Sequence, residues 1–169
     1  EDKFTKFKII KREKNLGLAE NKHDAINNSS GFFVTTLDSD DFYWNSQKLQ
    51  NEYNIIKRYN ANGIYNIISF SHIVTVAEDG SKIKSTKSKQ LIEGDIFFKL
   101  LTRRLSFIPR DFLMSREQYY EAGGFDINTK LYVDWYLKLK LAAFNKFYCA
   151  DIEGIAYRQH NNTRMSSAL

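Results

Sequence analysis

The sequence predicts one α/β domain over residues 1–169, with a mostly parallel central sheet. Segments rich in β-branched and aromatic residues alternate with segments whose apolar residues recur every three or four positions, the patterns of strands and helices respectively. Such alternation is typical of βαβ units and a parallel sheet. No internal repeat, low-complexity tract or Pro/Gly-rich linker divides the chain, so we expect a single domain.

The composition is that of a globular protein and narrows the function only slightly. Hydrophobic residues make up 43% of the chain and charged residues 27%. No stretch approaches the roughly 18 apolar residues that a membrane-spanning helix needs. One cysteine, Cys149, excludes an internal disulfide. The net charge of +5 is compatible with nucleic acid, an anionic membrane surface or phosphate-bearing ligands, and does not choose among them.

The first third of the chain contains four expected elements. FKII at 7–10 predicts a short strand, and the segment 19–30 predicts a short helix that ends at a serine-glycine pair. FFVTTL at 32–37 is apolar on both faces, as in a central strand buried from both sides. Asn45 and Ser46 offer an N-cap for a helix that reaches about residue 60.

The rest of the chain continues the alternation. A β-rich segment at 64–77, the turn EDGS at 78–81 and the segment 82–86 predict a hairpin. The remaining elements are expected in this order: a basic amphipathic helix at 94–105, a short strand at 111–115, a helix at 116–124, a helix at 131–144 and two short strands at 146–160.

Three aspartates, Asp38, Asp40 and Asp41, follow the expected strand at 32–37. An Asx-turn and a helix cap explain one or two such residues, but three within four positions exceed that need. Like charges this close destabilise a fold unless a cation or donor groups compensate them. Ligands of open α/β sheets bind at the carboxyl ends of strands, where these residues fall. A Mn²⁺ or Mg²⁺ ion would neutralise the carboxylates and hold phosphate oxygens.

Several rival motifs fail against the sequence. An EF-hand loop beginning at Asp38 needs glycine and glutamate where Tyr43 and Leu49 stand. A phosphatase of the haloacid-dehalogenase type needs threonine where Phe42 stands. The sequence contains no P-loop, H-E-x-x-H, C-x-x-C or G-x-S-x-G motif. What remains is a metal–phosphate site without a covalent nucleophile.

Three segments in order resemble the family 2 glycosyltransferases of the GT-A fold. They are NLGLAENKHDAINNSSGFFVTTLDSDD at 15–41, EAGGFDINTKLYVDWYLKLKLA at 121–142 and YRQHNNTRMS at 157–166. The resemblance implies inverting transfer of a sugar from a nucleotide-sugar, most often a UDP-sugar, to a saccharide or lipid-linked acceptor hydroxyl. It also implies a cytoplasmic protein, at the inner face of the membrane where the acceptor is lipid-linked, and a role in bacterial surface polysaccharide or glycolipid synthesis.

The resemblance assigns roles to the acidic residues and their neighbours. Asp134 is the expected catalytic base, although Val133 stands where the family has glutamate; alone, Asp134 is also explained as an acid at a helix start. The metal ligands expected from the resemblance are Asp38, Asp40 and His160, and the donor-binding residues are Asp38, Asp41, Lys22 and His23. Lys22 and His23 replace the family's usual Arg-Asn pair.

Two features of the chain stay open beside the resemblance. Family members begin with a strand–helix unit and a second strand that bind the nucleotide base, so we expect this chain to be incomplete at its N-terminus. Arg103 and Arg104 form either a solvated helix face or a contact with anionic lipid headgroups.

Two other functions compete with sugar transfer. A basic RNA-binding module needs Lys and Arg interleaved with exposed aromatic residues on one sheet face, whereas the basic residues here are scattered, so nucleic acid is not expected as a partner. The other alternative is a different metal-dependent transferase that acts on nucleotides, such as a nucleotidyltransferase. Such an enzyme would also use the acidic cluster, but analysis of its products would distinguish it from a glycosyltransferase.

Overall fold

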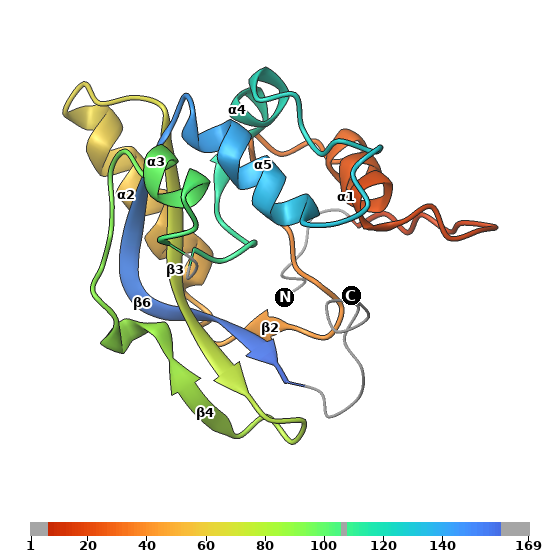
Figure 1. The fold of residues 1–169 in the computed structure, drawn as a ribbon, viewed down its shortest axis with the longest axis horizontal. Coiled ribbons are helices and arrows are strands. Elements are labelled where there is room, and N and C mark those ends of the chain that lie inside the picture. The colour runs from red at the N-terminus through yellow and green to blue at the C-terminus, as the bar shows by residue number, and fades with distance from the viewer. Residues whose placement is uncertain (1–6, 106–107, 160–169) are drawn as a thin grey trace.

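The computed structural model describes residues 7–105 and 108–159 (Figure 1). The helices of the described chain are α1 (Leu18–Asn27), α2 (Lys48–Ala61), α3 (Phe97–Leu101), α4 (Arg116–Glu121) and α5 (Val133–Ala142), with a 3₁₀ turn at Thr86–Ser88. The strands are β1 (Phe33–Val34), β2 (Phe42–Tyr43), β3 (Ile67–Val76), β4 (Lys82–Ser85), β5 (Met114–Ser115) and β6 (Lys146–Arg158). The expected helices at α1, α2, α4 and α5 and the β3–β4 hairpin are confirmed.

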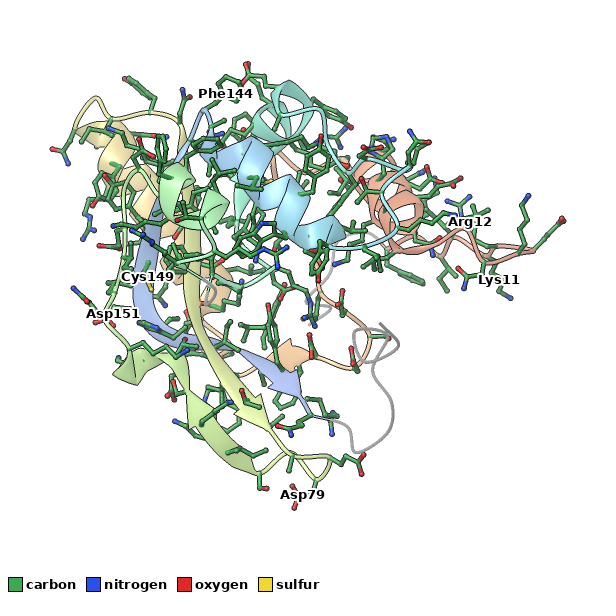
Figure 2. The ribbon with its side chains drawn as sticks, in the orientation of Figure 1. Lys11, Arg12, Asp79, Phe144, Cys149 and Asp151 are labelled. Atoms are coloured by element: carbon green, nitrogen blue, oxygen red, sulfur yellow. The ribbon has the colours of Figure 1, made fainter. Side chains whose placement is uncertain are left out.

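The central sheet is mixed, so the prediction of a mostly parallel sheet is wrong. Its strand order is β2-β6-β3-β4, and only β3 and β6 are parallel neighbours. The tight turn at Asp79 and Gly80, whose tip is marked by Asp79 in Figure 2, forces β4 to return antiparallel. β1 and β5 form a separate antiparallel pair, and a bridge between Ser69 and Leu113, the residue before β5, links this pair to β3.

β6 is one bent strand of 13 residues, not the two short strands expected from the sequence. Its pairing with β3 shifts register on either side of His72, so β6 carries extra residues at this point. Asp151 occupies the bend with φ of 49° and projects outward (Figure 2). A bulge of this kind bends a strand without ending it. The bend carries Tyr157 and Arg158 toward β2, as Figure 1 shows for the curved end of β6.

Three other local predictions are corrected by the structure. Residues 7–10 form no strand, because no neighbouring strand pairs with them and Phe7 is 85% exposed. The basic helix is limited to α3, since Arg103 takes a left-handed φ of 53° just after it. α2 begins after Gln47, whose amide donates to the Asn45 side chain (2.8 Å).

Helices cover both faces of β3. Ile67 packs in a cluster with Ile56 of α2, whereas Ile68 and Phe70 belong to the main core with residues of α1, α3 and α5. Because neighbouring residues of a strand point to opposite faces, α2 lies on one face of the sheet and the main core on the other. In the described part of the chain, every helix is too short or too polar to cross a bilayer.

Candidate metal and donor site

The three aspartates lie on the loop between β1 and β2, which we call the acid loop (residues 35–41). A tight turn, in which the Asp41 amide donates to the Asp38 carbonyl (3.1 Å), folds the three side chains together. One carboxylate oxygen from each of Asp38, Asp40 and Asp41 lies within 4.8 Å of the other two. Hard oxygen donors at this spacing suit a Mg²⁺ or Mn²⁺ ion.

Lys22 of α1 compensates part of the negative charge. Its Nζ lies 3.0 Å from Asp38 Oδ1 and 2.9 Å from Asp134 Oδ1. Burial lowers the pKa of Lys22, but the carboxylates of Asp134 and Asp38 raise it by more, so the pKa ends above its ordinary value. Lys22 is therefore a charged link between the acid loop and the first turn of α5.

Arg110, just before β5, supplies a second cation. Its Nε lies 2.7 Å from Asp38 Oδ2, and its guanidinium also pairs with Asp41. The other oxygen of Asp41 accepts from the Arg158 amide (3.1 Å). Burial raises the pKa of Asp41, while Arg110 opposes the rise. Because both oxygens of Asp41 are held by the protein, this residue anchors the acid loop.

A buried layer beneath Arg110 holds the guanidinium in place. The Tyr157 ring lies 4.2 Å from the guanidinium carbon, and Tyr157 Oη accepts from the Arg110 amide (2.8 Å). Tyr157 Oη in turn donates to Asp111 Oδ2 (2.8 Å). Burial raises the pKa of Asp111 to about 6. Sequence reasoning missed Arg110 and Tyr157; the available signal was the charged pair in the otherwise apolar run FIPRDFLM.

α5 brings Asp134 to the acid loop from a distant part of the sequence. Leu137 and Leu141 lie on the buried side of this helix, one and two turns after Asp134. This packing fixes the start of α5, and the shared ammonium of Lys22 places Asp134 beside Asp38. The Asp134 side chain is 25% exposed, so a ligand can reach it.

The predictions for the two histidines have different outcomes. His23 points away from the acids, with Nδ1 2.7 Å from Tyr119 Oη, because adjacent residues of a helix project about 100° apart. His160 lies outside the described residues.

A cleft of about 810 Å³ opens between α1 and residues 31–40. Lys22, Asp38 and Asp40 are among its lining residues, together with the apolar side chains of Leu18, Ile26 and Val34. Cavities of a few hundred to about 1,000 Å³, mostly apolar with a few convergent polar groups, are typical of small-molecule sites. Asp38 and Asp40 therefore line a cavity large enough for a nucleotide.

A family comparison identifies the chain. The model described as glycosyl transferase family 2 matches residues 1–122. The chain belongs to glycosyl transferase family 2. In this family 2 domain, the D-x-D-like acid loop and Lys22 lie within the matched residues. The resemblance read from the sequence is confirmed.

A solved structure supports the fold of the family 2 domain. The crystal structure of S. aureus TarS 1-349 matches with a TM-score of 0.61 and 16% sequence identity, over 87% of this chain and 42% of the TarS chain. At this identity the similarity establishes the fold, the α/β architecture of a GT-A glycosyltransferase, and not the substrates. The chain spans less than half of the TarS chain. No match is found among the curated proteins.

Proposed function

We propose that this family 2 domain transfers a sugar from a nucleoside-diphosphate-sugar, with UDP-sugars as the first candidates, to an acceptor hydroxyl with inversion. One observation carries the proposal. The ammonium of Lys22 lies within 3.0 Å of both Asp38 of the acid loop and Asp134 of α5. A donor-side acid and a candidate base are thus held close together by one cation, and a displacement at a single carbon requires that proximity.

The acid loop fits a divalent cation by the chemistry and spacing of its oxygens. Asp38 and Asp40 would hold Mn²⁺ or Mg²⁺, and His160 is proposed as a further ligand. The bound ion would stabilise negative charge on the diphosphate leaving group. Lys22 contributes a second positive charge at the donor site, and Asp41 contributes by anchoring the loop. A donor contact for His23 would require its ring to leave Tyr119.

Asp134 acts as the general base in this proposal. Its carboxylate removes the proton of the acceptor hydroxyl while the acceptor oxygen bonds to the anomeric carbon and the carbon–oxygen bond to the diphosphate breaks on the opposite face. Lys22 orients the carboxylate through its 2.9 Å hydrogen bond. The acceptor is a saccharide, free or lipid-linked, and we place the reaction at the cytoplasmic face of the membrane.

The test separates binding from chemistry. Asp134→Asn keeps an oxygen for the Lys22 hydrogen bond, so donor affinity measured by calorimetry with Mn²⁺ should stay at the wild-type level. Turnover, measured as nucleoside diphosphate release, should fall by about 10²-fold or more. Asp79→Asn, at the exposed tip of the β3–β4 hairpin, is the matched control and should change neither quantity. Wild-type turnover in Asp134→Asn would remove this residue from the mechanism.

A further inference from the structure

An arginine after α3 lies against two aromatic side chains at the start of α5, the helix that carries the proposed base. The Arg103 guanidinium lies 4.9 Å from the centre of the Tyr132 ring and 5.9 Å from that of Trp135. Tyr132 and Trp135 flank Asp134 in the sequence, so Arg103 is held next to the start of α5. The aromatic rings attract the cation but do not cancel its charge.

Within residues 7–105 and 108–159, no carboxylate forms an ion pair with Arg103. Arg110, by contrast, is paired with two aspartates. A guanidinium presents five N–H donors in a planar fork that matches phosphate and carboxylate groups. Arg103 is exposed, and Tyr132 is 60% exposed, so both side chains are open to a ligand.

Local backbone preferences do not explain these two residues. Arg103 follows the C-cap of α3 with a left-handed φ of 53°, a position that glycine normally occupies. Tyr132 is the N-cap of α5 with φ of 56°, and its side chain makes no capping bond. Each conformation is unfavourable for a residue that carries a side chain. Both residues adopt unfavourable backbone conformations, and their side chains contact each other. Departures of this kind are typical of functional sites, so the contact between the two side chains is a candidate for a function.

We propose that Arg103 and Tyr132 form an acceptor subsite that selects a sugar bearing an anionic group, a phosphate or a carboxylate. Arg103 pairs with the anion, and the exposed Tyr132 ring packs against the sugar, which directs the acceptor hydroxyl toward Asp134. This inference rests on the proposed function, because it takes Asp134 as the base. It names the acceptor class that the base serves.

The test follows the backbone amide signals of Tyr132, Asp134 and Trp135 by NMR during titration with glucose 6-phosphate, glucuronate and glucose. In the wild type, at least one of the two anions should bind about tenfold more tightly than glucose, which corresponds to about 1.4 kcal/mol for a charge-assisted contact. The two anions separate a phosphate from a carboxylate preference. Saturable binding of neither anion, or equal affinity for glucose, would overturn the subsite.

Three variants decide whether Arg103 carries the selectivity. Arg103→Gly should abolish the preference for anions while the melting temperature rises, since glycine accepts the left-handed backbone. Arg103→Lys should retain part of the preference, because it keeps the charge without the fork. Arg104→Gln, at the adjacent exposed arginine, is the matched control and should bind like wild type. Unchanged anion preference in Arg103→Gly, or equal loss in Arg104→Gln, would contradict the proposal.

Two further measurements separate this inference from its competitors. Flotation with phosphatidylglycerol vesicles that depends on Arg103, without binding of the soluble anions, would make the pair a membrane contact and overturn the subsite. Mn²⁺-dependent UDP binding is measured on the same samples. Intact UDP binding with no anion preference would defeat only the subsite, whereas absent UDP binding with an intact anion preference would defeat the proposed function.

Discussion

Asp40 is the residue on which cation binding is expected to depend most directly. Asp40 lines the cleft, and its side chain is the most exposed of the three acids of the acid loop. Asp40→Asn should therefore abolish Mn²⁺-dependent binding of UDP in calorimetry. The metal-free protein should be no less stable, because one of three crowded charges is removed.

The control for this change is Asp79→Asn, at the exposed tip of the β3–β4 hairpin, which should bind UDP and Mn²⁺ as wild type does. The metal-site proposal fails if Asp40→Asn and Asp79→Asn bind them equally well.

β6 depends on a glycine where it passes α2. A Cβ added to Gly154 would collide with the Ser71 side chain and lie 3.0 Å from Lys48 Cγ. The Gly154 carbonyl accepts from the amide of Trp44, just after β2 (3.0 Å). Gly154→Ala should lower the free energy of unfolding by about 1–3 kcal/mol through overpacking. Urea denaturation measures the change, and Ser71→Gly in the same chain should recover part of it. Wild-type stability in Gly154→Ala would show that this packing relaxes freely.

The segment before β5 should give stability a pH dependence. The pKa of the buried Asp111 is about 6, above its ordinary value near 3.8, because burial disfavours the charged form. Between these values the folded state binds the proton more tightly than the unfolded chain does. The free energy of unfolding should therefore fall as the pH rises from about 4 to about 6, by up to about 3 kcal/mol from this one group.

Asp111→Asn removes this titration, so its stability should fall less than that of the wild type between the two pH values. Urea denaturation at the two ends of the window measures the difference, and Asp95→Asn, an exposed acid before α3, serves as control. Parallel pH profiles for wild type and Asp111→Asn would place the titration elsewhere.

Elements were predictable where the signal is local. The periodicity of α1, α2 and α5 and the turn before β4 lie in contiguous sequence, and each was expected close to where it is found. The bend of β6 depends on its register against β3, and the failure of residues 7–10 to form a strand depends on a missing partner. Neither is visible in a local pattern, because strand pairing is a tertiary property.

At the scale of the whole molecule, donor and cation should stabilise the fold together. UDP with Mn²⁺ should raise the melting temperature, whereas either alone should do little; saturation to about 100 times the dissociation constant corresponds to about 2.7 kcal/mol. A panel of nucleoside diphosphates identifies the base, and single-stranded RNA is the contrasting ligand. Salt-sensitive stabilisation by RNA without any response to UDP and Mn²⁺ would favour the nucleic-acid alternative.

The proximity of the three aspartates was predictable from the sequence, whereas their pairing with Arg110 was not. Asp38, Asp40 and Asp41 form one continuous stretch, so their proximity follows from the sequence alone. Arg110 and Tyr157 reach the acid loop from about 70 and 116 residues away, through the fold of β5 and the bend of β6. Only the three-dimensional arrangement shows how the crowded charge is balanced.

The hairpin strand β4 also bears on how copies of the protein meet in solution. Among the described strands, the four-stranded sheet ends in β4 on one side and in the two-residue β2 on the other. β4 is four residues long, and Lys82 and Lys84 on it are exposed. An edge that is short and lined with ammonium groups discourages another chain from adding a strand, since the incoming backbone would strip water from those charges. We therefore expect the protein to stay free of edge-to-edge aggregates in concentrated solution. Replacement of both Lys82 and Lys84 by valine should cause such aggregation.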